Sequence, residues 1–462
     1  MSSKGTLDVQ AFFDDSPFSG YQWIVFALCF VVVLLDGFDT AAIGYIAPSL
    51  LKEWGIAKPA LAPVLSAALF GLAAGALAAG PLADRFGRKI VLLGSVLVFA
   101  IACLASAFSS SLDHLTAMRF ITGIGLGAAM PNAVTLISEY SPTRRRSMLT
   151  SAMFCGFPLG AACGGFLAAW MIPQWGWRSV LMLGGVAPLV LLVVMIPLLP
   201  ESVRYMVARR FPAEKIRAVL TRISAAAAGA TEFTLVEIVA SKAKSSLGVV
   251  LSRSYIVGSM MLWIAYFMGL VIFYALINWM PMLMKDAGLA PKDAALVSAL
   301  FPLGGVGAVF FGWLMDRVNG NRVVAIGYAL TAVAIFAIGQ TVGNVGVLML
   351  MVLLAGTLMN TAQVSMPALA AGFYPTQGRA TGVAWMLGVG RFGGIAGSTL
   401  VAELTRRELS LEQIFMLVAI PGLIAAAALL IKQFAHPETS QEHLATVEEA
   451  HGHRQEAGMG EP

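Results

Sequence analysis

The chain has 462 residues, of which 58% are hydrophobic and 12% are charged, and its formal net charge at pH 7 is +5. Soluble globular domains carry roughly 25% charged residues, so the composition excludes an ordinary soluble fold. The basic balance does not indicate a nucleic-acid-binding protein, because the Lys and Arg residues gather in particular loops between apolar runs.

Long apolar runs dominate the sequence. A helix that crosses the hydrocarbon core of a membrane needs about 20 mainly apolar residues. Backbone polar groups in lipid must be satisfied within the segment, so each run is expected to be helical, and the short alternating segments of a transmembrane barrel are not seen. We therefore predict an all-α integral membrane protein with twelve transmembrane helices, at residues 23–48, 61–80, 90–108, 115–137, 148–171, 179–199, 254–281, 293–314, 323–341, 345–370, 380–403 and 412–434.

The first span is not expected to be a cleaved signal peptide. It is too long, and residues 1–22 carry three aspartates and no small-residue cleavage pattern. The four cysteines lie in apolar runs without metal-ligand spacing, so we interpret them as packing residues and expect no metal or other cofactor. These cysteines are Cys29, Cys103, Cys155 and Cys163.

The loops on the two sides of the membrane differ in charge. With twelve spans, 21 of the 30 Lys and Arg residues lie on the side of the two termini and 7 lie on the opposite side. Positively charged loops stay in the cytoplasm. Both termini are therefore predicted to be cytoplasmic.

The chain divides into two halves that repeat. One long polar segment separates two six-helix bundles, which gives a tail at 1–22, a bundle at 23–200, a cytoplasmic loop at 201–252, a bundle at 253–435 and a tail at 436–462. Two pairs of loops match at nearly one offset, namely "GPLADRFGRK" (80–89) with "GWLMDRVNGN" (312–321), and "YSPTRRRSMLT" (140–150) with "YPTQGRATGVA" (374–384). We predict that the halves are structural repeats; the alternative is unrelated loops that each need Asp and Arg.

The first of these loops has the composition of a latch. Asp84 can accept hydrogen bonds from helix N-terminal amides of the neighbouring half, while the two arginines pair with nearby carboxylates and the two glycines permit a tight turn. We predict that these contacts close the cytoplasmic side; topological anchoring explains the basic residues alone but not Asp84. The second copy lacks the distal Gly-Arg pair and is expected to latch less strongly. The predicted gating residues are Gly80, Asp84, Arg85, Gly87 and Arg88, with Asp316 and Arg317 in the second copy.

Four charged residues, Asp36, Asp39, Arg119 and Arg391, lie well inside the predicted spans, away from the helix ends. Each costs roughly 2.5–3.5 kcal/mol at a helix centre on insertion scales, so each is a functional candidate. At the helical rise per residue, the two aspartates lie roughly 20–24 Å above the cytoplasmic end of their span, and Arg119 lies at a similar height. We predict a cluster in which one carboxylate pairs with Arg119 and the spare one carries a proton; a purely structural ion pair is the alternative.

Arg391 lies about 10 residues into the eleventh span, near the midplane, with no obvious acidic partner at that depth. A buried guanidinium without a fixed partner suits a carboxylate ligand, which it can hold through two parallel hydrogen bonds. We therefore predict that Arg391 binds the carboxylate of a substrate.

Polar and aromatic residues of the second half are further candidates. In the seventh span they recur along one stripe and can stack on or hydrogen-bond to a ring, although a lipid-facing or packing stripe is an equal alternative. The tenth span adds two amides on one face. The predicted substrate-binding residues here are Tyr266, Tyr274, Asn278, Asn360 and Gln363.

Several of these motifs resemble a known family. "GPLADRFGRK" and "PESVRY" (200–205) are similar to signatures of the major facilitator superfamily, whose two six-helix halves bind substrate near the midplane between them. "DGFDTAAIGYIAPSL", "RFITGIGLGAAMPN", "SEYSPTRRRSM" and "YPTQGRATGVAWMLGVGRFGG" resemble its aromatic acid:proton symporter family, and in particular bacterial transporters of 4-hydroxybenzoate and protocatechuate.

The resemblance implies proton-coupled import of a small aromatic carboxylate, such as a hydroxylated benzoate, across the bacterial inner membrane by a functional monomer. The proton gradient would be the driving force, with no cofactor. Functional positions would carry over onto Asp36, Asp39, Asp84, Arg119, Glu139 and Arg391, with Glu139 joining the two aspartates as a proton-coupling residue.

Other functions stay open at this point. A drug/proton antiporter of the same fold is expected to carry a Gly-Pro-rich signature in the fifth span, which "GFPLGAACGG" does not fit. A sugar porter shares the "PES" element but does not need Arg391. An aromatic-acid chemoreceptor would bind without accumulating its ligand. A membrane enzyme is not expected, because no nucleophile–base pair or metal spacing is present.

Overall fold

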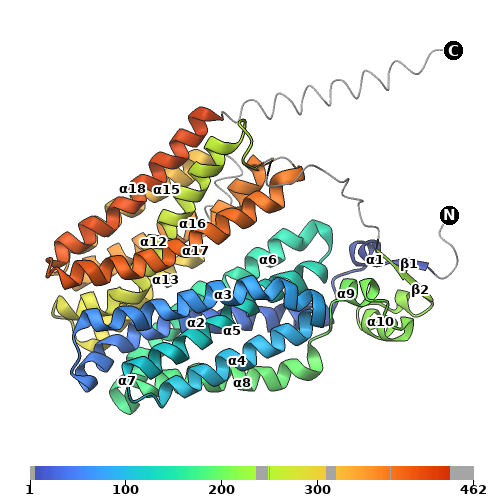
Figure 1. The fold of residues 1–462 in the computed structure, drawn as a ribbon, viewed down its shortest axis with the longest axis horizontal. Coiled ribbons are helices and arrows are strands. Elements are labelled where there is room, and N and C mark those ends of the chain that lie inside the picture. The colour runs from blue at the N-terminus through green and yellow to red at the C-terminus, as the bar shows by residue number, and fades with distance from the viewer. Residues whose placement is uncertain (1–5, 236–247, 249, 308–318, 375, 437–462) are drawn as a thin grey trace.

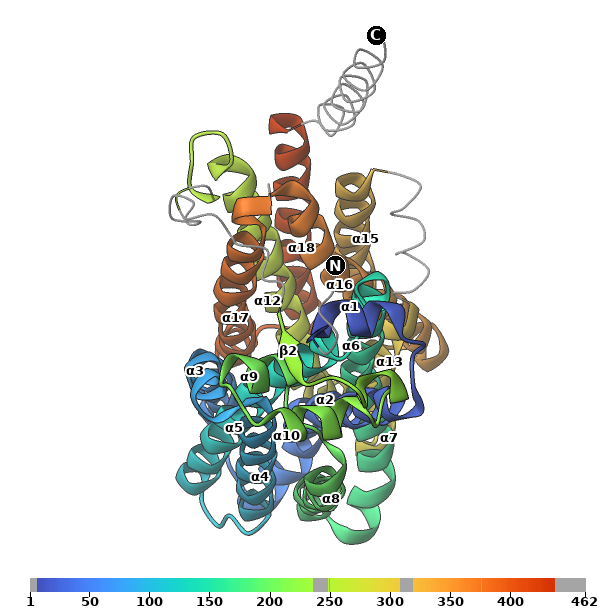
Figure 2. The same cartoon turned by 90° about the vertical axis from the view of Figure 1, so that its right-hand side faces the viewer.

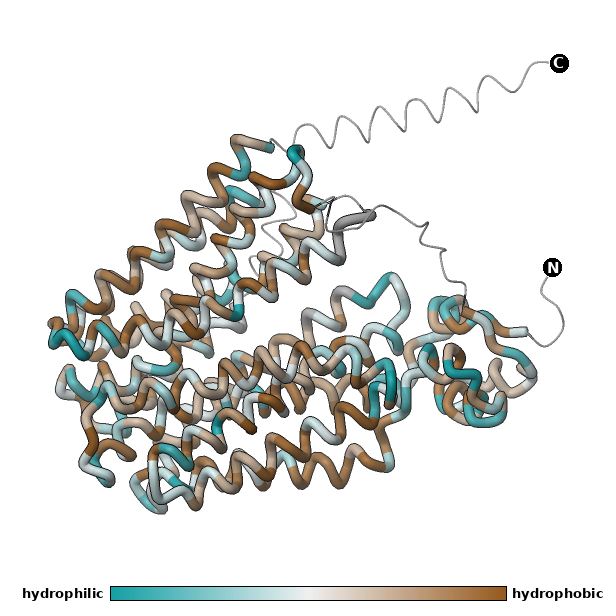
Figure 3. The backbone as a smooth tube through the Cα atoms, in the orientation of Figure 1, coloured by the Kyte–Doolittle hydropathy of each residue, from teal (hydrophilic) through white to brown (hydrophobic). Residues whose placement is uncertain are grey.

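The computed structural model describes residues 6–235, 248, 250–307, 319–374 and 376–436. Figure 1 shows two helical bundles and a small unit beside the first of them. Apolar residues dominate the helices of both bundles, and hydrophilic residues gather at helix ends and in the small unit (Figure 3).

Helices α2 to α8 form the first bundle and helices α12 to α18 form the second. The first contains α2 (Gly20–Trp54), the short η1 (Lys58–Leu61), α3 (Ala62–Phe86), α4 (Arg88–Ala107), α5 (Leu112–Glu139), η2 (Thr143–Arg145), α6 (Arg146–Phe154), α7 (Gly156–Trp175) and α8 (Arg178–Leu198). The second contains α12 (Ile256–Asp286), α13 (Pro291–Leu303), η4 (Gly304–Gly307), α15 (Gly320–Gln340), α16 (Val345–Phe373), α17 (Thr376–Arg406) and α18 (Leu411–Ala435). Each of the twelve predicted spans contains a described helix, and the predicted all-α membrane fold is confirmed.

Ten helices in the described part of the chain are long and apolar enough to cross a membrane. Local signals set several helix ends. Ser19 and Gln22 form a capping box at the start of α2, and Gly55 ends that helix in the left-handed conformation, with φ of 62°. Ser410 and Gln413 form a second capping box at the start of α18.

Close packing of α3 on α5 positions the site described below. A Cβ on Gly71 of α3 would lie 2.0 Å from the Phe120 carbonyl oxygen, and a Cβ on Gly127 of α5 would lie 2.1 Å from the Leu72 carbonyl oxygen. Only glycine permits two helix backbones to approach this closely, as small residues do at many membrane helix interfaces.

The two bundles meet at one end and diverge toward the other, where α2 begins (Figure 1). At the closed end, Lys58 before α3 pairs with Asp286 of α12 at 2.5 Å. Gly44 of α2 also abuts the backbone of α12, because a Cβ there would lie 2.6 Å from the Ile277 carbonyl oxygen. The two bundles therefore diverge on the side of the termini, here called the termini side.

A small unit, here called the cap, covers the first bundle on the termini side (Figure 2). It contains β1 (Thr6–Asp8), α1 (Val9–Asp15), α9 (Val203–Ala208), α10 (Ala213–Leu220), η3 (Ala225–Ala227) and β2 (Glu232–Thr234). β1 and β2 pair in parallel, with Thr6 opposite Glu232. Phe12 and Phe13 are buried in the same hydrophobic cluster as Tyr140. The pairing of the N-terminal segment with the central loop was not predicted from the sequence.

Candidate binding site

A buried ion pair joins α2 to α5. Nη1 of Arg119 donates to Oδ1 of Asp39 at 2.9 Å, and Nη2 donates to the Asp39 backbone carbonyl at 3.3 Å. The two side chains are 0% and 1% exposed. The Cys103 thiol of α4 donates to the same Oδ1 at 3.1 Å. The predicted contact between Arg119 and the first span is thus present, and it uses Asp39.

Asp36 lies one turn earlier on α2 and is 2% exposed. Thr40 donates its hydroxyl to Oδ1 of Asp36 at 3.4 Å. Among the described residues, no Lys, Arg or His nitrogen lies within 4.0 Å of this carboxylate. Arg391 and Tyr274, both from the second bundle, lie within electrostatic range of it. Asp36 is therefore the spare carboxylate of the pair, and it lies where the two bundles meet.

Arg391 contacts the opposite bundle. Its Nη1 donates to the backbone carbonyl of Leu72 on α3 at 3.0 Å. No carboxylate in the described part of the chain lies within 4.0 Å of its guanidinium, so most of its donors are available to a ligand.

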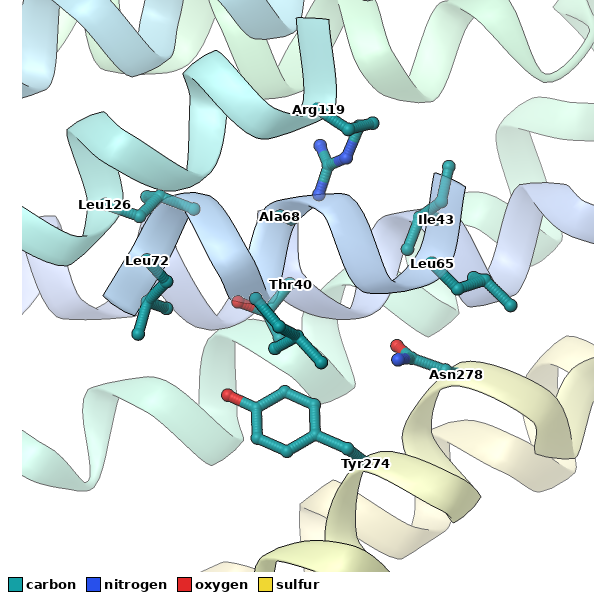
Figure 4. Close-up of a pocket in the computed structure, with 10 residues that line it drawn as sticks. Thr40, Ile43, Leu65, Ala68, Leu72, Arg119, Leu126, Tyr274 and Asn278 are labelled. Atoms are coloured by element: carbon teal, nitrogen blue, oxygen red, sulfur yellow. The ribbon is translucent and has the colours of Figure 1, made fainter. Parts of the chain in front are cut away.

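A pocket lies between α2, α3 and α5 of the first bundle and α12 of the second. Its walls are largely aliphatic. Figure 4 shows the Thr40 hydroxyl, the Tyr274 hydroxyl and the Asn278 carboxamide directed into this space. The lining residues are Thr40, Ile43, Leu65, Ala68, Leu69, Leu72, Arg119, Leu126, Tyr274 and Asn278. A largely apolar pocket with a few placed polar groups is typical of a small-molecule site.

Three of the predicted binding residues have packing contacts instead. The Tyr328 hydroxyl donates to Oε1 of Gln363 at 2.6 Å, and Gln363 Nε2 donates to the Tyr266 carbonyl at 3.5 Å. Asn360 donates to the carbonyls of Phe301 and Gly356, at 3.2 and 2.7 Å. None of the three predicted residues lines the pocket. Their role in binding stays a prediction.

Among the described residues, the predicted latch residues of the first copy have contacts within their own bundle and with the segment that leads into the cap. Asp84 pairs with Arg88 at 3.0 Å and its side chain is 72% exposed. Gly87, with φ of 94°, allows the start of α4 to approach Glu201, which accepts the Arg88 amide at 2.8 Å. The Arg85 carbonyl accepts a hydrogen bond from Tyr205, at 2.9 Å. The latch to the second bundle stays a prediction, because the bundles are apart on this side.

Other predicted gating and coupling residues lie elsewhere. A Cβ on Gly80 would meet nothing within 4 Å. Asp316 and Arg317 lie outside the described residues. Glu139, at the termini-side end of α5, accepts a hydrogen bond from the Ser202 hydroxyl. Because it follows Arg119 by 20 residues, it lies about 30 Å along the helix from the ion pair. The structure does not bring Glu139 to the two aspartates.

Sequence reasoning missed three partners. Cys103 was interpreted as a packing residue, and nothing in its apolar run marks it as a donor to Asp39. The Leu72 carbonyl that binds Arg391 carries no sequence signal, because it belongs to a regular helix. Glu201 did carry a sequence signal, because it is the only carboxylate in the "PESVRY" motif.

Two membrane-embedded helical bundles with a polar site between them are the architecture typical of a secondary transporter. The chain belongs to the Major Facilitator Superfamily, whose family model matches residues 29–322 and 262–456. It is a multi-pass membrane protein, and the family consists of transporters and not of enzymes.

Curated relatives and solved structures agree with this assignment. The chain is 51% identical to the "4-hydroxybenzoate transporter PcaK" of Pseudomonas aeruginosa over 92% of this chain and 96% of that protein. It is 47% identical to the "Gallate transporter" of Pseudomonas putida, over 92% and 94% of the two chains. A crystal structure of a D-xylose–proton symporter matches with a TM-score of 0.71 at 19% identity, over 91% of this chain and 99% of that one, and supports the fold alone.

Proposed function

We propose that this protein imports hydroxylated aromatic carboxylates, with 4-hydroxybenzoate as the leading substrate, together with protons across the bacterial inner membrane. The relatives with about half of their residues in common are transporters of 4-hydroxybenzoate and gallate by name. Both substrates are aromatic acids with ring hydroxyls, and the pocket offers aliphatic walls with separate polar groups.

The observation that carries the proposal is that the charged residues of the site differ in their partners. Asp39 is held by Arg119, whereas Asp36 has no cation within 4.0 Å among the described residues. An ionisable group inside a membrane protein that lacks a structural partner is a candidate for proton transfer. Arg391, which hydrogen-bonds only a backbone carbonyl among the described residues, is the candidate for the substrate carboxylate.

The proposed cycle follows from this arrangement. Asp36 takes a proton while the site is open to the outside, and the substrate binds with its carboxylate at Arg391. The bundles then rock about the site, and the contact between Lys58 and Asp286 closes the outer side behind the substrate. Release of the proton and the substrate on the termini side returns Asp36 to its charged form. The proton gradient supplies the driving force, and no bound cofactor is required.

Orientation and assembly belong to the same proposal. The excess of basic residues on the termini side favours cytoplasmic termini. The pocket is built from the two bundles of one chain, so a monomer contains a complete site.

Uptake of a panel of radiolabelled aromatic acids into cells, with and without a protonophore, tests the proposal. We expect accumulation of 4-hydroxybenzoate that the protonophore abolishes. Accumulation that is insensitive to the protonophore would refute proton coupling. Binding without accumulation would favour a receptor, and reduced cellular retention would favour an exporter.

A further inference from the structure

Two polar atoms of the pocket, Oδ1 of Asn278 and the hydroxyl oxygen of Tyr274, have no hydrogen-bond partner in the described part of the chain. The Asn278 side chain is 2% exposed and donates through Nδ2 to the Ser398 hydroxyl oxygen at 3.3 Å, which leaves its Oδ1 as an available acceptor. The Tyr274 hydroxyl has no partner among the described residues either. Both lie on α12, one helical turn apart, which is about 6 Å along the axis.

These groups lie toward different ends of the pocket. In Figure 4 the hydroxyls of Tyr274 and Thr40 point toward the end at Leu72, whereas the Asn278 carboxamide lies at the other end, beside Leu65. Leu72 is also the residue whose carbonyl accepts from Arg391. One end of the pocket is therefore next to a cation and two hydroxyls, and the other end offers a neutral acceptor.

The other lining side chains are aliphatic, with the exception of Arg119, whose guanidinium is already paired with Asp39. The aliphatic walls suit the faces of an aromatic ring, which need no hydrogen-bond partner. The pattern of cation, apolar wall and acceptor is complementary to a carboxylate, a ring and a hydroxyl in that order.

We infer that Asn278 is the specificity-determining residue that accepts a hydrogen bond from the 4-hydroxyl of the substrate, with the carboxylate directed toward Arg391. This inference rests on the proposed function and adds the orientation of the substrate and the residue that reads its hydroxyl. Ser398 is the positioning residue, because its contact with Nδ2 turns Oδ1 toward the pocket.

The inference also predicts which ligands bind well. Because Nδ2 is engaged by Ser398, the 4-substituent must be a donor. 4-Hydroxybenzoate and 4-aminobenzoate should bind well. Benzoate and 4-fluorobenzoate leave Oδ1 unpaired and should bind roughly tenfold more weakly, as expected for loss of one buried hydrogen bond.

Calorimetric titration of the purified full-length protein with these four ligands tests the inference. Wild type should show the donor-dependent order, and Asn278→Leu should bind all four ligands with similar affinity. Asn132→Leu, at a buried asparagine whose amide bonds within its own helix, is the matched control and should keep the wild-type order.

The possible outcomes distinguish the role of Asn278 from the proposed function. Equal binding of 4-fluorobenzoate and 4-hydroxybenzoate by wild type, or an unchanged order in Asn278→Leu, would overturn the role of Asn278 and leave the proposed function intact. Failure of wild type to bind any aromatic carboxylate would overturn both. If Asn278→Leu does not fold, the wild-type series decides alone.

Discussion

The Arg119 guanidinium lies 2.9 Å from the Asp39 carboxylate in a fully buried ion pair, whereas Asp36, one turn earlier on the same helix, has no cation within 4.0 Å among the described residues. The two aspartates have the same chemistry and nearly the same depth. Their surroundings separate them, because the ion pair joins α5 to α2 through Asp39, whereas Asp36 accepts a hydrogen bond from Thr40.

Breaking the ion pair should destabilise the protein. Arg119→Ala leaves Asp39 as a buried, unpaired charge, and removal of one partner of a buried pair typically costs about 3–5 kcal/mol. Thermal unfolding in detergent should show a clear loss in this variant and substantial recovery in the double variant Arg119→Leu, Asp39→Leu. Glu403→Gln, at an exposed pair on α17, is the control and should change little. A wild-type melting temperature for Arg119→Ala would contradict this account of the pair.

Arg391 should be required for binding and not for folding. Its described hydrogen bond goes to a backbone carbonyl, so its loss leaves no carboxylate unpaired in the described part of the chain. We expect Arg391→Ala to fold and to lose affinity for 4-hydroxybenzoate by orders of magnitude. Arg391→Lys should recover little, because an ammonium cannot form two parallel hydrogen bonds. Unchanged affinity of Arg391→Ala in calorimetry would place the carboxylate elsewhere, with Arg119 as the next candidate.

The ion pair of Lys58 and Asp286 should bias the protein toward the form that is open on the termini side. It joins the two bundles at the closed end, and its side chains are 40% and 31% exposed. A partly exposed pair contributes about 0.2–1 kcal/mol, so Lys58→Gln should shift the balance of the two forms only a few-fold. Labelling rates of a cysteine placed on the closed side measure this balance. The swap Lys58→Asp, Asp286→Lys should restore it, and equal rates in wild type and Lys58→Gln would contradict the prediction.

Docking of α1 should depend on Asp14. Partial burial alone would raise the pKa of this carboxyl, but hydrogen bonds from the Thr143 amide, Gln10 and the Thr143 hydroxyl outweigh it and hold the pKa below its ordinary value of 3.8. A lowered pKa in the folded state stabilises docking above pH 3.8, and this stabilisation is lost as the pH falls through the folded pKa.

Hydrogen exchange of the α1 segment measures this docking. We expect faster exchange in Asp14→Asn at neutral pH than in wild type, and a smaller difference between them in acid. Asp15→Asn is the matched control, because the neighbouring Asp15 accepts no side-chain hydrogen bond in the described part of the chain. Equal exchange in Asp14→Asn and Asp15→Asn at neutral pH would show that the carboxylate of Asp14 does not hold α1.

The sequence predicted features that depend on local pattern. Span positions follow from apolar runs, and the meeting of Arg119 with the first span follows from depth along two helices. The choice between Asp36 and Asp39 could not be predicted, because both lie on one face and the choice depends on the position of α5 along α2. The pairing of Thr6 with Glu232 could not be predicted either, since 226 residues separate them and neither strand has a periodic pattern.

For the candidate site residues, too, the local pattern predicted some positions and not others. Tyr274 and Asn278 belong to a stripe that the sequence identified, and the structure places both at the pocket. Tyr266 belongs to the same stripe, but its ring faces α17, where a Cβ on Gly390 would lie 2.2 Å from it. Helical spacing predicts which residues share a face of one helix, but it does not predict which residues of other helices they contact.

Transport by Asp36→Asn in proteoliposomes tests the central claim most directly. The amide cannot carry the coupled proton, but it leaves the Asp39–Arg119 pair and Arg391 in place. We predict that this variant still exchanges 4-hydroxybenzoate across the membrane when substrate is present on both sides, and no longer accumulates it in response to a proton gradient. Wild-type accumulation by Asp36→Asn under the same gradient would contradict the account.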